Sequence, residues 1–368
     1  MNKYYLKWPM TAKCLMNCKF CYNKKSRKNW SQEINKEDLK KFISIINNNE
    51  YINGITLSGG EPTISNNFFD FCDNINKPFG FISTGDNLFD KKFINVLENK
   101  NLQFITISID CLNPIIVKEI RGKDVLNNQL KTIKYLIYLR KNNPKCNFQI
   151  YINTVLTKMN VNEIEKLVDE LANNEIDRLQ IFRYFMSGRK DIDSELKLSF
   201  EREIEITDIL INLYNKNRVK WDDKGFNLIL RHLPPIGGLY YEKKHNKTLP
   251  FKSRECGIKR NTIYLNSDTT LNLCKIYHKD IFNEIKHLKF AEIDFEILKV
   301  KLLDIVANEV NSFKYYNNYF PCSECELLNT RCNPCTSIGR DGKTNVEYEE
   351  CISYFKLLKS GRCKSEKI

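Results

Sequence analysis

The chain has 368 residues, of which 42% are hydrophobic and 28% charged, so we expect a globular protein rather than a disordered one. Its formal net charge of +13 comes from basic residues spread along the whole chain, which favours a solvated basic surface over a nucleic-acid-binding block. No apolar run reaches the length of a membrane span and no signal peptide is visible at the start, so we predict a cytoplasmic location without a membrane partner.

Strand-like runs alternate with amphipathic helical runs over the first half of the chain. After a short strand near residues 4–7, strands are expected at 52–60, 79–84, 103–110, 148–156 and 177–185, and helices at 35–48, 87–99, 124–142 and 160–174. This repeated strand–helix unit predicts an α/β fold with a parallel sheet or barrel. In such folds functional side chains gather at the carboxyl ends of the strands.

The character of the sequence changes in the second half. A long helix is expected at 194–217, and a less regular stretch follows it. From about residue 251 cysteines return at 256, 274, 322, 325, 332, 335, 351 and 363. Residues 262–274 are typical of a β-hairpin that turns at 266–268, and 294–310 of a helix. We expect three regions: a strand–helix core at 1–195, a helical bridge at 196–250 and a cysteine-rich region at 251–368.

Three cysteines follow the first predicted strand directly. Cys14, Cys18 and Cys21 lie in CLMNCKFCYN, and fourteen cysteines in a reducing compartment indicate metal ligands rather than disulfides. Zinc usually takes four ligands, as does a 4Fe–4S cluster. Three thiolates on a cluster leave one iron open to a substrate or cofactor. The motif therefore leaves zinc, an iron–sulfur cluster and chance as alternatives.

A second motif, LSGGEPT at 57–63, ends the next predicted strand. Paired glycines allow a close approach of backbone to a ligand, and the adjacent carboxylate can accept hydrogen bonds from an amine. With both motifs at neighbouring strand ends, residues 1 to about 190 resemble the radical S-adenosylmethionine (SAM) enzymes.

That resemblance implies a partial (β/α)6 TIM-like barrel. It implies a 4Fe–4S cluster on Cys14, Cys18 and Cys21, whose open iron takes the methionine part of SAM. A 5′-deoxyadenosyl radical then abstracts a substrate hydrogen. The resemblance also implies SAM contacts for Phe20 and Leu156 (adenine), Ser83 (ribose), Gly59, Gly60 and Glu61 (amino group), and Ser108 and Arg121 (carboxylate).

The C-terminal cysteines have two interpretations. Taken alone, CSECELLNTRCNPC at 322–335 fits zinc, although zinc ribbons separate their cysteine pairs by more residues. Together with the first half, the layout resembles the SPASM extension of radical SAM enzymes, a cysteine-rich domain with a β-hairpin plus helices and loops. The resemblance implies two auxiliary 4Fe–4S clusters, an outer one on Cys322, Cys325, Cys332 and Cys351 and an inner one on Cys256, Cys274 and Cys335.

Two positions depart from that family pattern. No cysteine follows Cys256 closely, so the inner cluster either has an open iron or takes Cys363. Lys275 stands where sulfatase-maturing members have an aspartate base. A charged lysine is a poor base, which speaks against the sulfatase-maturing reaction.

The resemblance predicts an oxidoreductase with three 4Fe–4S clusters and SAM. We expect it to oxidise or cross-link an amino-acid residue of a ribosomally made peptide or protein, with flavodoxin or ferredoxin as reductant. One alternative is a peptide epimerase, in which Cys111 at a strand end donates a hydrogen atom. A structural role is commoner for such a cysteine. Others are a dehydrogenase of a small carbohydrate-like molecule and a non-catalytic electron carrier, which would not need a SAM site.

Overall fold

Eight parallel strands form the centre of the molecule. The computed structural model describes residues 3–21, 33–184, 194–249, 261–271, 289–305, 320–328, 330, 332 and 346–360. Within these ranges the strands form one sheet in the order β7-β6-β5-β4-β3-β2-β1-β8. Their bounds are β1 (Tyr4–Thr11), β2 (Ile52–Gly59), β3 (Phe79–Ser83), β4 (Leu102–Ser108), β5 (Gln149–Leu156), β6 (Arg178–Arg183), β7 (Asn227–Arg231) and β8 (Thr262–Tyr264).

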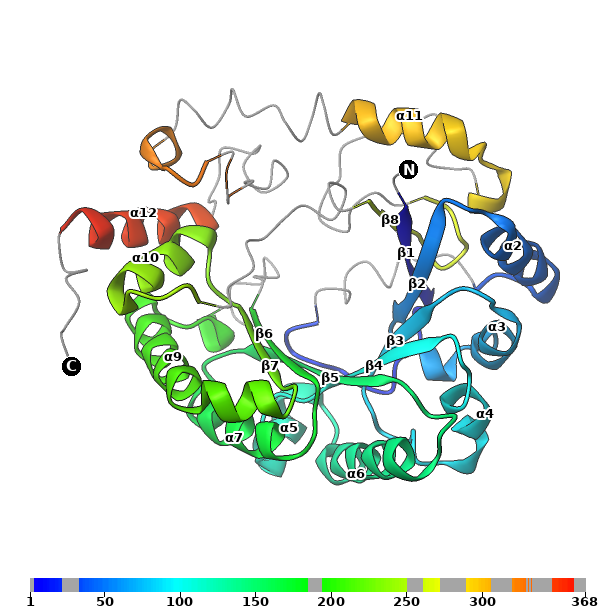
Figure 1. Ribbon diagram of the computed structural model, residues 1–368, viewed down its shortest axis with the longest axis horizontal. Helices are drawn as coiled ribbons and strands as arrows, with labels where there is room; N and C mark the ends of the chain where they lie inside the picture. Colours follow the sequence, from blue (N-terminus) through cyan, green and yellow to red (C-terminus); the bar gives the residue numbers. More distant parts are fainter. Residues whose placement is uncertain are drawn as a thin grey trace.

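Helices cover the outer side of this sheet, which curves into an open ring (Figure 1). Helix α11 lies near α2 and β8, whereas α12 packs on α10 at the other side of the opening. The helices are α2 (Lys36–Asn48), α3 (Phe68–Asn74), α4 (Ile94–Leu97), α5 (Pro114–Arg121), α6 (Leu126–Asn142), α7 (Ile164–Asn173), α9 (Phe200–Asp223), α10 (Pro235–His245), α11 (Phe295–Ile305) and α12 (Val346–Lys359).

The predicted parallel α/β partial barrel is confirmed. From β1 to β7, strands that follow one another in the chain are neighbours in the sheet, as repeated strand–helix units require. The sheet has two further strands besides the expected six. Strand β7 lies within 196–250, expected as a helical bridge, and β8 pairs in parallel with the free edge of β1. The boundaries of the three regions stay a prediction.

The main core lies between the sheet and its helices. Tyr4, Leu6, Trp8 and Met10 alternate along β1 and are all buried. The Trp8 ring lies 5.0 Å from Phe42 of α2 and 5.4 Å from Phe71 of α3, between ring centroids. This packing fixes β1, and therefore the start of the cysteine loop that follows it.

Some local expectations needed adjustment. The helix expected at 87–99 is reduced to α4 and a preceding 3-10 turn, because the Asp90 side chain accepts from the Lys92 N–H and starts the turn there. The hairpin turn after β8 is present, since the Asn266 N–H donates to the Thr270 carbonyl oxygen at 2.8 Å.

In the part of the chain that the structure describes, no helix is both long and apolar enough to cross a membrane.

Candidate active site

The loop after β1 carries Cys14, Cys18 and Cys21, and the end of α5 holds it in place. The Asn17 and Lys19 N–H groups donate to the carbonyl oxygens of Arg121 and Ile120, at 2.9 and 2.8 Å. All three thiols are partly exposed. The loop is therefore fixed through its backbone, and its three cysteine residues are not fully covered by the rest of the protein.

Electrostatics link the three thiols. Burial raises the pKa of Cys18 to about 11; Arg121 lowers it, and the nearby Cys21 and Cys14 raise it further. Iron binds thiolates, and its positive charge offsets the cost of placing several negative sulfur atoms together. Three neighbouring thiols are the kind of donors that an iron–sulfur cluster uses, and the arginine beside one of them favours its thiolate form.

The GGE motif packs against the cysteine loop. The Gly60 and Glu61 N–H groups donate to the carbonyl oxygens of Thr11 and Lys13, both at 2.8 Å. A Cβ atom on Gly60 would lie 2.0 Å from the Lys13 oxygen, and Gly59 has a φ of 138°. We expected these glycines to approach a ligand; the close approach that the structure shows is to the chain's own backbone.

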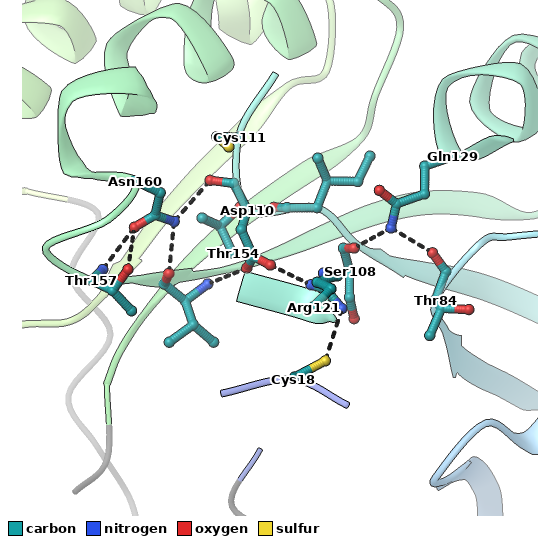
Figure 2. A network of polar contacts seen from close by, with 12 residues as sticks. Cys18, Thr84, Ser108, Asp110, Cys111, Arg121, Gln129, Thr154, Thr157 and Asn160 are labelled. Carbon is teal, nitrogen blue, oxygen red and sulfur yellow. Dashed lines mark hydrogen bonds and ion pairs between the residues drawn. The ribbon is translucent and has the colours of Figure 1, made fainter. Parts of the chain in front are cut away.

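Polar contacts connect the ends of β2, β3 and β4. The Glu61 carboxylate accepts from the Thr84 N–H at 2.6 Å and from the Thr63 hydroxyl at 2.7 Å. The Gln129 side-chain amide donates to the carbonyl oxygens of Thr84 and Ser108, both at 2.7 Å (Figure 2). Two residues expected at a SAM site, Glu61 and Ser108, are therefore positioned by one network.

Arg121 stands between this network and the cysteine loop (Figure 2). Its Nη2 lies 2.6 Å from Asp110 Oδ2, and its Nη1 faces the Cys18 sulfur at 4.0 Å. Its guanidinium lies 5.6 Å from the centroid of the Phe20 ring. Asp110 Oδ1 accepts a hydrogen bond at 3.1 Å from the N–H of Val155, the residue before the last one of β5. Arg121, expected at the SAM carboxylate, is thus already paired on one side.

The Asn160 side chain holds the backbone around Asp110 through hydrogen bonds. Its Nδ2 donates to the carbonyl oxygens of Asp110 and Val155, at 2.8 and 2.9 Å. Its Oδ1 accepts from the N–H and the hydroxyl of Thr157, both at 2.8 Å. Sequence reasoning did not place Asp110, Gln129 or Asn160 in the site. For Asp110 a signal was present, because it stands in the SID stretch with Ser108.

Ser83 and Leu156 lie at the ends of β3 and β5, and both are buried. The Ser83 hydroxyl oxygen accepts from the Gly85 N–H at 3.0 Å. The described contacts of these two residues are therefore within the protein. Their expected roles at ribose and adenine stay predictions.

Cys111 is fully buried within the hydrophobic core. Its thiol donates to the Asn113 carbonyl oxygen at 3.6 Å, and burial raises its pKa to about 11. In Figure 2 it lies on the other side of Asp110 from Cys18. A hydrogen-donor role for Cys111 stays a prediction that these contacts do not favour.

The second cysteine cluster surrounds one cavity, with about 310 Å³ of space not filled by atoms, open solvent included. Burial raises the pKa of Cys322, one of its thiols, to about 11. The lining consists of the four cysteines expected at the outer auxiliary cluster and of apolar side chains: Cys322, Cys325, Cys332, Cys351, Ile236, Pro321, Leu327 and Leu328. We call this cavity the thiol pocket. Cys256, Cys274, Cys335, Cys363 and Lys275 lie outside the described residues.

The thiol pocket fits a cluster in its donor set. Four thiols with an otherwise apolar lining are what a 4Fe–4S cluster needs, because each thiolate binds a different iron. The fit is one of donor type and number only, because within the described ranges no three or more His, Cys, Asp or Glu side chains are arranged to hold a metal ion.

Comparison with known proteins finds a match to one superfamily in the first half of the chain. The pattern of the radical SAM superfamily matches residues 8–171. A GTP 3′,8-cyclase of Alkaliphilus metalliredigens is 28% identical over 47% of this chain and 54% of its own length. An Fe-coproporphyrin III synthase of Methanosarcina barkeri is 22% identical over 60% of this chain and 52% of its own length. The chain thus spans about half the length of these curated relatives.

Solved structures share the fold over more of the chain. SuiB of Streptococcus suis, bound to its precursor peptide SuiA, is 19% identical with a TM-score of 0.64, covering 92% of this chain and 72% of that one. The structure of anSMEcpe with bound AdoMet and the Cp18Cys peptide is 16% identical with a TM-score of 0.62, covering 99% of both chains. At these identities the likeness is one of fold.

Proposed function

Because residues 8–171 match the pattern of the radical SAM superfamily, we propose that this chain is a radical SAM enzyme that modifies a ribosomally made peptide or protein. The enzyme would abstract a hydrogen atom from an amino-acid residue and oxidise or cross-link that residue. That superfamily implies a 4Fe–4S cluster and SAM, which together supply a 5′-deoxyadenosyl radical. The observation that carries the proposal is the thiol pocket, which this chain has in addition to its cysteine loop.

The barrel residues have assigned tasks in this proposal. Cys14, Cys18 and Cys21 would hold the SAM-binding cluster on the loop that α5 fixes. Glu61, oriented by Thr63 and Thr84, would accept hydrogen bonds from the SAM amino group. Its neighbours at the strand ends would complete the site: Gly59 and Gly60 at the amino group, Ser83 at the ribose, Ser108 and Arg121 at the carboxylate, and Phe20 and Leu156 at the adenine.

The thiol pocket would supply an electron acceptor. A substrate radical that becomes an oxidised product must lose one electron, and Cys322, Cys325, Cys332 and Cys351 would hold the outer auxiliary cluster. An inner cluster on Cys256, Cys274 and Cys335, with Cys363 as a candidate fourth ligand, completes the proposed three. A flavodoxin or ferredoxin in the cytoplasm would supply the electron that starts each turnover.

The proposal of a peptide substrate is supported by how much of the chain resembles structures that contain bound peptides. The structures of SuiB and anSMEcpe with bound peptides share the fold over 92% and 99% of this chain. The match to the Alkaliphilus cyclase covers 47% of it. An epimerase that uses Cys111, a dehydrogenase of a carbohydrate-like molecule and a GTP cyclase are the competing activities.

Metal content tests the cluster assignment. Anaerobic reconstitution should give roughly twelve irons per chain. The Cys14→Ala/Cys18→Ala/Cys21→Ala variant should lose roughly four of them and all 5′-deoxyadenosine formation with dithionite. The matched control is Cys72→Ala, because Cys72 is buried in α3 and is not an expected ligand. Roughly four irons in the wild type, or tightly bound zinc at 322–335, would overturn the three-cluster assignment.

Mass spectrometry of co-expressed candidate peptides tests the reaction. The most informative candidate is a short peptide encoded by a neighbouring gene. Loss of two hydrogens supports oxidation or cross-linking. A gain of one deuterium in heavy water without other change indicates an epimerase instead. Consumption of GTP with release of 5′-deoxyadenosine, and no change in any peptide, would replace the proposal with the cyclase activity.

A further inference from the structure

Two side-chain amides lie next to each other on the inner face of the sheet. The Gln180 Nε2 group of β6 donates a hydrogen bond to Asn153 Oδ1 of β5, at 3.1 Å. We infer that these two residues, here called the amide pair, recognise the substrate by binding one of its amide groups. That the bound amide belongs to a peptide substrate rests on the proposed function.

The alternation of side chains along the strands places the amide pair on the side that the helices leave uncovered. The neighbouring residues Ile152, Leu179 and Ile181 are fully buried in the main core, between the sheet and its helices. Successive residues of a strand point to opposite faces, so Asn153 and Gln180 point away from the helices. The helices lie outside the curved sheet (Figure 1), and both amide residues are partly exposed.

The amide pair shares one row of the sheet with the expected SAM site. Asn153 is in register with Ser108 of β4 on one side and with Gln180 on the other. Neighbouring strands lie about 4.8 Å apart, so the backbones at Ser108 and Gln180 are about 10 Å apart. Ser108 is expected at the SAM carboxylate. A group bound at the amide pair would therefore lie beside SAM, in the same layer of the barrel.

Rings and guanidinium groups lie above and below the amide pair along the strands. Toward the strand starts, Arg178 Cζ lies 4.1 Å from the centroid of the Tyr151 ring, which stacks on Phe104 at 5.3 Å between centroids. Toward the strand ends, Arg231 Cζ lies 5.8 Å from the Phe182 centroid. Tyr151, Arg178 and Phe182 each lie two residues from a member of the pair, which places them on the same face about 6.6 Å away. Between these layers the pair offers a neutral donor beside a neutral acceptor.

The single hydrogen bond within the pair leaves that donor and that acceptor for a ligand. Among the residues that the structure describes, neither Asn153 Nδ2 nor Gln180 Oε1 makes a hydrogen bond. An amide ligand satisfies both atoms, because its carbonyl oxygen accepts and its N–H donates. A carboxylate lacks the donor, and an ammonium or guanidinium group lacks the acceptor. Main-chain peptide groups and the side chains of asparagine and glutamine all supply this chemistry.

A reversal of ligand preference tests the amide pair. The probes are benzamide and benzamidine, which share one shape, but benzamidine is a cation that only donates. Ligand-observed NMR on the reconstituted full-length protein measures the Kd of each. Wild type should bind benzamide at least about tenfold more tightly. Asn153→Asp keeps the acceptor for Gln180 Nε2 and replaces the free donor by a carboxylate oxygen, so this variant should prefer benzamidine.

Two further variants complete this test. Gln180→Met removes the acceptor and should weaken benzamide binding by about tenfold. Asn227→Asp is the matched control, because Asn227 is exposed and in register with Arg178, on the same face as the pair. It adds the same charge and should keep the wild-type preference. Reversal in both aspartate variants, or in neither, would overturn the inference. Weaker SAM binding with unchanged probe binding in Asn153→Asp would also overturn it, by assigning the pair to SAM.

Competition with benzamide identifies the source of the amide and separates this inference from the proposed function. N-acetylalanine N-methylamide has main-chain amides only, whereas N-acetylasparagine N-methylamide adds a side-chain amide. Displacement by both supports main-chain recognition, and displacement by the second alone supports side-chain recognition. GTP also carries an amide, within its guanine ring. Displacement by GTP and by neither amino-acid probe would overturn the peptide substrate, while the reversal in Asn153→Asp would still support amide recognition. Displacement by the amino-acid probes without that reversal would overturn the inference and leave the proposed function standing.

Discussion

Arg121 Nη2 lies 2.6 Å from Asp110 Oδ2, and the two side chains are only 4% and 1% exposed. Asp110 follows β4, Arg121 ends α5, and Arg121 also faces the cysteine loop through Cys18. Burial lowers the pKa of Arg121, but Asp110 and Cys18 raise it above its ordinary value, so the guanidinium stays charged. One ion pair therefore joins a strand end, a helix end and the loop with the expected cluster ligands.

Asp110→Asn should destabilise the protein strongly. The substitution leaves a buried guanidinium without its counter-charge, which costs about 3–5 kcal/mol of unfolding free energy. Urea unfolding of the full chain measures this loss. The matched control is Asp177→Asn, which removes a partner from the more exposed Arg140 and should cost about 1 kcal/mol. A loss below about 1 kcal/mol in Asp110→Asn would show that the pair contributes little.

Gly60→Ala should displace the cysteine loop. The new methyl group would meet the Lys13 carbonyl oxygen at 2.0 Å, and backbone on both sides must move. We expect at least about tenfold slower SAM cleavage, which corresponds to about 1.4 kcal/mol. Gly225→Asn is the matched control, because Gly225 has a φ of 70° but no atoms within 4 Å of an added Cβ. Equal cleavage rates in the two variants would mean that the loop absorbs the methyl group.

Cys111→Ala should keep product formation within about tenfold of wild type. The thiol is fully buried and its hydrogen bond goes to the Asn113 carbonyl oxygen, so it does not face a substrate in the described structure. Its loss should cost about 1–2 kcal/mol of stability, as should Cys72→Ala, the matched control. Product formation and 5′-deoxyadenosine are measured together. Lost product with persistent SAM cleavage and full iron content would favour the epimerase.

His232 should make stability dependent on pH below neutrality. Burial lowers its pKa to about 3, with Arg183 acting in the same direction. In the unfolded chain its pKa is about 6.5, so between these values the unfolded state binds a proton that the folded state does not. Stability therefore falls as the pH drops below 6.5, by about 2 kcal/mol from pH 7 to pH 5. Urea unfolding at both pH values measures this decrease in stability. In His232→Gln the part of the decrease that comes from His232, about 2 kcal/mol, should be absent. An identical decrease in the wild type and in His232→Gln would show that His232 does not cause the pH dependence.

The sequence predicted the fold and the cysteine loop well because their signals are local. Strand–helix alternation, the spacing of Cys14, Cys18 and Cys21, and the GGE motif each lie within a few consecutive residues. The carboxyl ends of parallel strands meet at one edge, so the motifs were expected to meet there too. Helix α5 was missed although Pro114 begins it and Gly122, with a φ of 73°, ends it.

Only the tertiary structure decided which side chains meet. Gln129 and Asn160 looked like ordinary helix or cap residues, yet they connect the strand ends that surround the expected SAM site. Asn160 lies 50 residues after Asp110 in the sequence, and no local pattern relates the two. Such partners are selected when packing buries them together, since a buried charge or amide must then find a counterpart. The sequence by itself determined the barrel and the spacing of the cysteines, and packing determined which side chains meet around them.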